Sequence, residues 1–339
     1  MPIVLFAVVV VLIGAATPQP AAPLVATIVL PPNFDPDHMI VAGDEVWIAD
    51  SNLLDHTIFK LDASRTLAPV PMPSGLSGGD FALGTHGEIW MVADEPGKLV
   101  AIHPPEYIGK GPAQIVRIDP DGTLQTFKTS YDFANTIAIG PDGRPWFAAS
   151  DYDVAEVAAD GSIARVVTVK GADIDSMTLG PDGAMWFCAD NMDKIGRIAQ
   201  DRSVTYFDVP PNKTPRRIIA GPDGALWFNE SSLNEIARIT ASGAVTQYQM
   251  PRPDAVPGSL AFDDKKDLWF TEGRRGRVGR MKPDGTMEDW VVAGARLYPS
   301  IVRVGTDGRI WVSVDEEMFR DDPGVQYPPS ELVLFQPND

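Results

Sequence analysis

Hydrophobic and polar residues alternate in short runs along this chain, and turn residues separate the runs at regular distances. Residues 215–221 and 225–230 are two such runs, joined by the turn Pro222-Asp223-Gly224. Two more follow at 235–240 and 244–251, joined by Ser242-Gly243. A period of two predicts β-strands, and glycine at the tight turns predicts antiparallel pairing. The segment is therefore predicted to form a sheet of four short strands.

The same unit recurs along the chain, marked by a tryptophan in its second strand. The intervals between these tryptophans are 43, 56, 40, 41, 42 and 42 residues, and only Trp290 lies outside the series. The series is Trp47, Trp90, Trp146, Trp186, Trp227, Trp269 and Trp311. Repeats of roughly 40 residues with four strands and no helical period are typical of β-propeller blades. We predict an all-β fold, a seven-bladed β-propeller.

The last repeat lacks a strand that the start of the chain can supply. Its second strand is predicted at 310–315 and its third at 330–335, with no fourth. Residues 24–31 have the pattern of an outer strand and precede the first inner strand at 38–43. We predict that this N-terminal strand completes the seventh blade and closes the ring, which also removes an exposed sheet edge.

Two insertions lie between the second and third strands of their blades, roughly at 96–114 and at 316–330. In a four-stranded meander, these loops share a face with the connections that enter the inner strands. Both insertions are therefore predicted to overhang the same rim of the central channel, where loops often carry function.

The phrase Gly-Pro-Asp-Gly before the tryptophan is predicted to be a structural turn on the opposite face. Proline sets the first turn angle, aspartate bonds nearby backbone and glycine accepts a positive φ. We expect the tryptophan and the aromatic residue after it to pack between adjacent blades.

A carboxylate ends most of the second strands, near the rim that carries the insertions. These residues are Asp50, Asp94, Asp151, Asp190, Glu230, Glu272 and Asp315. One interpretation is that they cap backbone groups or pair with third-strand arginines, namely Arg117, Arg197, Arg238 and Arg280. The other is that several converge on a divalent cation such as Mg²⁺ or Ca²⁺.

The residues that open the inner strands differ from repeat to repeat, unlike the turns. They are Asp37-His38, Gly79-Asp80, Asn135-Thr136, Asp175-Ser176, Arg216-Arg217, Gly258-Ser259 and Ser300-Ile301. We interpret them as a polar ring around the channel mouth. The ligand-binding candidates are Asp80, Asn135, Thr136, Arg216 and Arg217, with Arg274 in a neighbouring loop at 273–277. The arginines either hold a carboxylate or phosphate of a ligand or neutralise nearby acids.

Four histidines and one cysteine are the other candidates for chemistry. His38 lies on the ring and is a candidate general acid/base, with a merely solvent-exposed histidine as the alternative. His56 and His103 fall in loops of the same face, and His86 in a turn of the other. Cys188 is predicted to be a buried, inert thiol. The sequence contains no zinc-ligand spacing and no G-x-S-x-G motif.

Composition and charge narrow the class of protein. The chain has 339 residues and a formal net charge of −18, which argues against nucleic acid or an anionic membrane as partner. Residues 1–22 contain an apolar run too short for a membrane span and are predicted to be a signal peptide, or else an N-terminal anchor. The mature chain, 23–339, is then a single propeller without a membrane span, secreted or periplasmic.

The repeats at 180–210 and 221–251 resemble those of the streptogramin lyase (virginiamycin B lyase) family, and the resemblance covers all seven repeats. It implies a propeller fold and, in the known lyase, a Mg²⁺-dependent elimination that opens a cyclic depsipeptide with a histidine as base. The family's histidine of the sixth inner strand falls on Gly258, and its Glu-Pro-His on Tyr298-Pro299-Ser300. Its last glutamate falls on Asp315, which alone keeps a carboxylate. The resemblance therefore does not extend to the lyase reaction.

A weaker resemblance links the chain to gluconolactonase-type propellers, which hold Ca²⁺ or Zn²⁺ with Glu, Asn and Asp. It implies such a part for Asn135 and Asp175.

Two functions follow as expectations. The first, which the missing lyase residues favour, is binding of a small polar or anionic ligand or of a protein partner at the channel mouth. The second is a metal-assisted lyase or hydrolase, lactonase-like, acting on a small cyclic or ester substrate. In that case His38 and Asp175 are the catalytic candidates. The metal candidates are Asp37, Asn135, Asp175 and Asp315.

Overall fold

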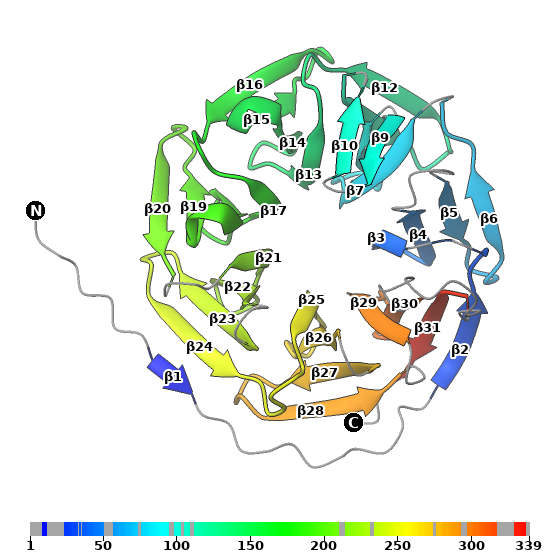
Figure 1. Cartoon of the computed structure of the whole chain (residues 1–339), viewed down its shortest axis with the longest axis vertical. Coiled ribbons are helices and arrows are strands. Elements are labelled where there is room, and N and C mark those ends of the chain that lie inside the picture. Colours follow the sequence, from blue (N-terminus) through cyan, green and yellow to red (C-terminus); the bar gives the residue numbers. More distant parts are fainter. Residues whose placement is uncertain are drawn as a thin grey trace, which may run out of the picture.

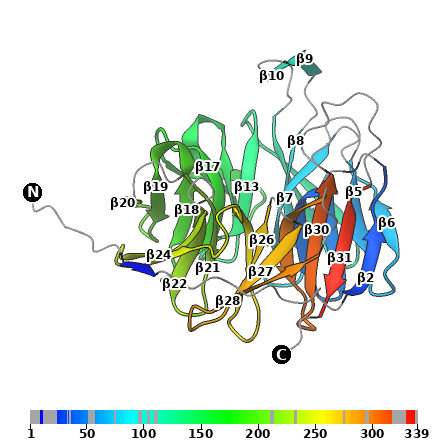
Figure 2. The same ribbon diagram turned by 60° about the horizontal axis from the view of Figure 1, so that its bottom comes forward.

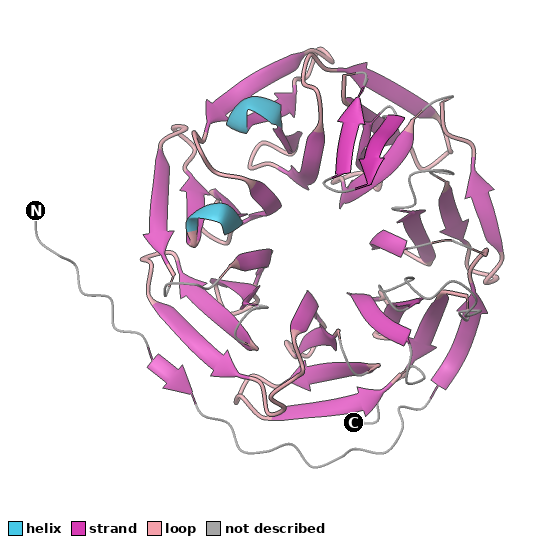
Figure 3. Cartoon of the chain, viewed as in Figure 1, coloured by secondary structure: helices cyan, strands magenta, loops and turns pink. Residues whose placement is uncertain are grey.

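Seven antiparallel sheets of four strands stand as blades around a common axis (Figure 1), as the repeat predicted. The computed structural model describes residues 9–11, 24–32, 34, 36–50, 57–73, 76–94, 98–102, 105–108, 112–209, 214–230, 234–273, 276–292, 297–316 and 329–336. Apart from the short helical turns η1 (Ser150–Tyr152) and η2 (Asp190–Met192), the described regular structure is strand (Figure 3).

Each blade is a meander that runs outward from the axis. Blades one to three consist of β3 (Pro36–Ala42), β4 (Glu45–Asp50), β5 (Ile58–Leu61) and β6 (Leu67–Val70); β7 (Ser77–Leu83), β8 (Ile89–Asp94), β11 (Gln114–Ile118) and β12 (Leu124–Lys128); and β13 (Ala134–Ile139), β14 (Pro145–Ala149), β15 (Asp153–Val157) and β16 (Ile163–Thr168). Blades four to six consist of β17 (Ile174–Leu179), β18 (Met185–Ala189), β19 (Lys194–Ile198) and β20 (Val204–Asp208); β21 (Pro215–Ala220), β22 (Ala225–Glu230), β23 (Glu235–Thr240) and β24 (Val245–Gln249); and β25 (Pro257–Phe262), β26 (Leu268–Glu272), β27 (Arg277–Met281) and β28 (Met287–Val291).

The seventh blade confirms the predicted closure of the ring. It contains β29 (Leu297–Val304), β30 (Ile310–Glu316) and β31 (Glu331–Phe335), and its outer strand is β2 (Leu24–Val29). β2 pairs antiparallel with β31, from Leu24 opposite Phe335 to Val29 opposite Glu331. The short strand β1 (Val9–Val11) runs parallel to β24 at the outside of blade five. The remainder of the predicted leader, 1–22, lies outside the described residues.

The insertion in blade two forms the hairpin β9 (Lys98–Ile102) and β10 (Pro105–Ile108), which projects from one face of the ring (Figure 2). It leaves the blade at the end of β8, where Asp94 pairs with Ser77 at the start of β7. The hairpin therefore rises on the face where the inner strands begin, as predicted. We call this face the entry rim. Most of the second insertion, 317–328, lies outside the described residues.

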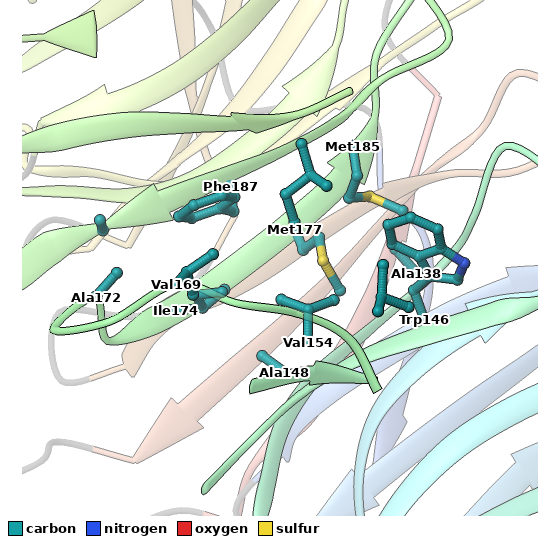
Figure 4. Packing of buried hydrophobic residues seen from close by; sticks show 13 residues of the cluster. Ala138, Trp146, Ala148, Val154, Val169, Ala172, Ile174, Met177, Met185 and Phe187 are labelled. Atoms are coloured by element: carbon teal, nitrogen blue, oxygen red, sulfur yellow. The ribbon is translucent and has the colours of Figure 1, made fainter. Parts of the chain in front are cut away.

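The core consists of apolar layers between neighbouring blades, as expected for the aromatic pair in each repeat. Trp146 and Ala138 of blade three pack with Met177 and Met185 of blade four (Figure 4). Trp186, which comes one residue after Met185, packs into the next layer instead, against blade five. Successive strand residues point to opposite faces, so each second strand supplies both layers that flank it.

The repeated turn and its contacts have a structural role, and we call them the frame. In blade four the carboxylate of Asp182 accepts the indole N–H of Trp186 at 2.9 Å and pairs with Nε of Arg197 at 2.7 Å. The Arg197 guanidinium also lies over the indole ring, 5.9 Å from its centroid. Gly183 has a φ of 72°, which glycine adopts without strain.

This arrangement corrects one of the two interpretations of the third-strand arginines. Arg197 stands opposite Trp186 in the sheet register, three residues from the end of β18. At about 3.3 Å per residue, it lies roughly 10 Å along the strand from the rim. The arginine therefore pairs with the turn aspartate and not with the rim carboxylate. Arg238 pairs with Asp223 of blade five in the same way.

We expect Gly180→Ala to lower the free energy of unfolding by about 1–3 kcal/mol, because a methyl group here overpacks a filled core. A Cβ at Gly180 would lie 2.4 Å from Cδ1 of Trp186, which is fully buried. Urea denaturation followed by tryptophan fluorescence measures the loss. Gly273→Ala is the matched control, because its Cβ would meet nothing closer than the Val256 carbonyl at 3.7 Å. Equal midpoints for the two variants would contradict the role of the indole.

Candidate functional site

Every inner strand is irregular at its first residues, and the irregularity falls on the predicted polar ring. The pairing between first and second strands shifts register at the same place in all seven blades. The skipped residues are Asp37, Gly79-Asp80, Asn135, Asp175, Arg216-Arg217, Gly258-Ser259 and Ser300. A β-bulge re-aims the side chain that it carries, and bulges are frequent next to binding sites. The polar ring therefore has the same backbone irregularity in every blade at the entry rim.

His38 lies between two carboxylates of neighbouring blades. Its Nε2 is 3.2 Å from Oδ2 of Asp37, and its Nδ1 is 3.3 Å from Oδ1 of Asp80. Burial works against a charged imidazole, but the hydrogen bonds to Asp37 and Asp80 outweigh it and raise the pKa of His38 to about 9. His38 is therefore an imidazolium cation at neutral pH, with both nitrogens donating. It can hold charge or donate a proton, but it is not free to act as a base.

Asp80 also couples blade two to blade three. Its Oδ2 accepts the hydroxyl of Thr136 at 2.7 Å and the backbone N–H of Ile137 at 3.2 Å. Burial raises the carboxyl pKa, but the bonds from His38 and Thr136 dominate and lower the pKa of Asp80 to about 2. Both oxygens are occupied, so the structure gives this predicted ligand residue a bracing role between the blades.

A second pair of carboxyl groups, Asp175 and Asp190, lies on the rim of blade four. Burial, followed by the charge and hydrogen bond of Asp190, raises the pKa of Asp175. Arg216 of blade five stands 3.9 Å from Oδ2 of Asp175, and both side chains are partly exposed. The structure thus brings the predicted Asp175 and Arg216 together.

Arg217 acts on groups from several blades. Its positive charge contributes to lowering the pKa of Asp37 in blade one and of Asp80 in blade two. It also contributes to lowering the pKa of Arg303 in blade seven. Arg217 lies in the bulge that opens the inner strand of blade five, so these charge effects act across the channel.

Sequence reasoning missed Arg303 because it considered only the ring positions. Arg303 lies further along β29, opposite Trp311 in the register. Its Nη1 donates to Oγ of Ser259 at 3.0 Å and to the Val302 carbonyl at 2.8 Å. A signal was present in the sequence, since the positions opposite the other six tryptophans carry no charged residue.

The other predicted ring residues occupy varied positions. Asn135 is exposed at the bulge of blade three, and Thr136 beside it is buried against Asp80. Asp315 is half-buried near the end of β30, opposite Tyr298.

Arg274, His56 and His103 lie outside the described residues, as do the side chains of Asp50, Asp94 and Asp151. Cys188 is fully buried, and burial raises the pKa of its thiol, so the prediction of an inert thiol is supported.

The predicted Mg²⁺ or Ca²⁺ ligands do not form a donor set as they stand. Asp37, Asn135, Asp175 and Asp315 come from blades one, three, four and seven. Within the described part of the chain, no three His, Cys, Asp or Glu side chains come together in a way that could hold an ion. Asp37 is engaged by the His38 cation, and Asp175 by Asp190 and Arg216. We derive no chemical step through a metal.

One rim carboxylate stands out from the others. Glu272 of blade six is 1% exposed, and its Oε2 has no hydrogen-bond partner. The two nearest arginines bind Asp289 instead, Arg252 through Nε at 2.6 Å and Arg277 through Nη1 at 2.6 Å. Burial, followed by the charge of Asp289, raises the pKa of Glu272 to about 7. This group titrates near neutral pH inside the blade and not in the ring.

Fold and site together define a seven-bladed propeller with a variable polar ring at one rim. The chain belongs to the virginiamycin B lyase family, whose sequence model matches residues 106–318. No curated protein matches the chain. Among the described residues, we find no helix with the length and apolar character of a membrane span.

Solved structures show the same architecture. A streptogramin B lyase is similar at a TM-score of 0.74 and 24% identity, over 92% of this chain and 97% of that one. A catalytically inactive virginiamycin B lyase from Staphylococcus aureus with quinupristin gives 0.73 and 25%, over 92% and 98%. YCF48 bound to D1 peptide gives 0.67 and 14%, over 95% and 99%, which shows the fold alone.

Proposed function

We propose that this protein is a binding propeller that holds a small polar ligand at its entry rim and has no streptogramin lyase activity. The observation that carries the proposal is the bulged ring, which differs in every blade. The frame on the other face repeats, so selection for folding alone gives no reason for this variety. Side chains re-aimed by bulges at one rim are suited to a ligand of mixed polarity.

The absence of lyase activity is supported by two ring positions. The position that resembles the family's base is Gly258, which has no side chain to take a proton. The third residue of the family's second motif falls on Ser300, whose hydroxyl lies 2.6 Å from that of Ser313. His38, the imidazole on the described ring, is held protonated by two carboxylates. An elimination needs a base that is free to accept a proton.

We expect the protein to leave intact quinupristin, the compound present in the Staphylococcus aureus lyase structure, with chromatography and mass spectrometry as the measurement and an active lyase as the positive control. We also expect Asp175→Ala with Arg216→Ala to weaken binding of the tightest ligand at least tenfold. That ligand is selected by calorimetry from uncharged sugars, polyols and carboxylates. Opened antibiotic, or unchanged affinity in the double variant, would contradict the proposal.

A second candidate function is acid/base catalysis on a small cyclic or ester substrate. The raised pKa of Asp175 favours it, because a carboxyl group that keeps its proton can act as a general acid. If this protein is a metal-assisted lyase or hydrolase, chelation of divalent ions abolishes turnover. Under the binding proposal, chelation leaves the affinity for the selected ligand unchanged.

A further inference from the structure

One position of the inner strands breaks the repeat in the seventh blade. It is the residue that stands opposite the blade tryptophan in the sheet register. In order of blades the residues are Ile40, Ala82, Ala138, Thr178, Ile219, Ala261 and Arg303. Six blades use a small or apolar side chain, which suits packing between blades. The guanidinium of Arg303 therefore needs another explanation than the frame.

Within the described chain, Arg303 has no acidic partner. The two acceptors of its Nη1 group, a serine hydroxyl and a backbone carbonyl, are both neutral. It is half-buried, and burial together with the charge of Arg217 lowers the pKa of Arg303 to about 10. Placing a cation here works against folding, because buried charges are normally paired. Its Nε and Nη2 groups are left for another partner.

Arg217 also lacks an acidic partner. Its backbone N–H donates to Oδ1 of Asn229 at 2.8 Å, and the residue lies in the bulge of blade five. The guanidinium of Arg217 makes no ion pair with a carboxylate in the described part of the chain. Asp37 and Asp80 are near enough to feel its charge, but both are hydrogen-bonded to His38. Arg216 next to it differs, because it stands beside Asp175.

Two guanidinium groups of the inner strands, Arg217 and Arg303, therefore have no ion pair in the described part of the chain, because His38 takes both Asp37 and Asp80. Arg217 belongs to the ring, and Arg303 lies three residues further along its inner strand than the ring position Ser300.

We infer that Arg217 and Arg303 form a binding site for a carboxylate group, which makes the ligand of the proposed function a carboxylate. The inference rests on that proposed function. Planar guanidinium groups match the two oxygens of a carboxylate and form paired, charge-assisted hydrogen bonds with them. The nearby carboxylates Asp37 and Asp80 repel a phosphate dianion more strongly than a singly charged carboxylate.

The test is calorimetry of the full chain with sodium lactate, inorganic phosphate, glucose and a short peptide in free-acid and C-terminal amide forms, at matched ionic strength. We expect lactate or the free-acid peptide to bind, and the stronger of the two identifies the source of the carboxylate. Arg217→Gln and Arg303→Met should each raise that Kd at least tenfold. Arg303→Lys keeps the charge, and its Kd should stay within about fivefold of the wild-type Kd. This variant tests the site if Arg303→Met does not fold. Arg309→Gln, in a turn on the opposite face where Arg309 pairs with Asp307, should change nothing.

The outcomes separate this inference from the proposed function. Carboxylate binding that is unchanged in Arg217→Gln and in the Arg303 variants overturns the site. Tighter binding of phosphate than of lactate and the free-acid peptide overturns the choice of carboxylate. If only glucose binds, and if Asp175→Ala with Arg216→Ala weakens that binding, this inference is overturned and the proposed function stands. If no probe binds and the uncharged panel fails as well, both are overturned.

Discussion

Asp80→Ala should lower the free energy of unfolding at pH 7 by about 2–4 kcal/mol, the range expected when one partner of a partly buried ion pair with several hydrogen bonds is removed. The change removes the acceptor of three protein groups, Phe81 N–H at 2.9 Å, Thr136 Oγ1 at 2.7 Å and Ile137 N–H at 3.2 Å. It also takes one of two carboxylates from the His38 cation. Urea denaturation at pH 7 measures the loss, and titration of the imidazole by NMR should show the pKa of His38 moving down from about 9.

The pH dependence of this group of charges has a defined window. The pKa of His38 is raised from 6.5, so its contribution is full below pH 6.5 and is lost as pH rises through about 9. The pKa of Asp80 is lowered from 3.8, so its contribution is full above that value and is lost as pH falls through about 2. Asp37→Ala is the matched control. Its side chain is 53% exposed, so its loss should cost below about 1 kcal/mol. Equal losses for the two variants would show that Asp80 does not brace the blades.

The fold could be predicted because its determinants are local and repeated. A turn with a residue at positive φ, followed by an aromatic residue, fixes one strand pair, and seven copies fix the ring. That residue is glycine in six blades and Lys266 in blade six. The closing strand was predictable because the seventh repeat is one strand short and β2 supplies it. Two contacts of the frame were not predictable from pattern alone. The close approach of Trp186 to Gly180 and the pairing of Arg197 with Asp182 both depend on which residues stand opposite each other in the sheet.

The candidate site could be predicted in position but not in chemistry. Counting back from the tryptophans located the ring, because every blade bulges at the same place. Which side chains pair across blades depends on how consecutive blades pack, which brings His38 of blade one to Asp80 of blade two. The effect of Arg217 on Arg303 joins blades that are not consecutive, so it depends on the arrangement of the whole ring. Arg303 itself was detectable in the sequence, but only by comparing one inner-strand position through all seven repeats.

Glu272→Gln should remove a pH dependence of stability that wild type shows between about pH 5 and 8. The folded state keeps its proton up to a pKa of about 7, whereas the ordinary value is 4.5. Between these values the folded state binds more protons than the unfolded state, so the stability of wild type falls as pH rises. Above pH 7 the buried charge costs on the order of 3–4 kcal/mol, because the pKa lies about 2.5 above its ordinary value and each pKa unit corresponds to about 1.4 kcal/mol. The variant should therefore match wild type near pH 5 and exceed it by roughly that amount at pH 8.

Urea denaturation at pH 5, 6, 7 and 8 measures this difference, and Glu288→Gln in the same blade is the control with the opposite sign. Burial raises the pKa of Glu288, but hydrogen bonds from Lys282 and Arg280 outweigh it and lower the pKa. Loss of that carboxylate should destabilise the protein at pH 8, where Glu272→Gln stabilises it. Parallel pH profiles for wild type and Glu272→Gln would show that Arg252 and Arg277, although they bind Asp289, also neutralise Glu272. Glu272 would then be ionised in the folded protein at neutral pH.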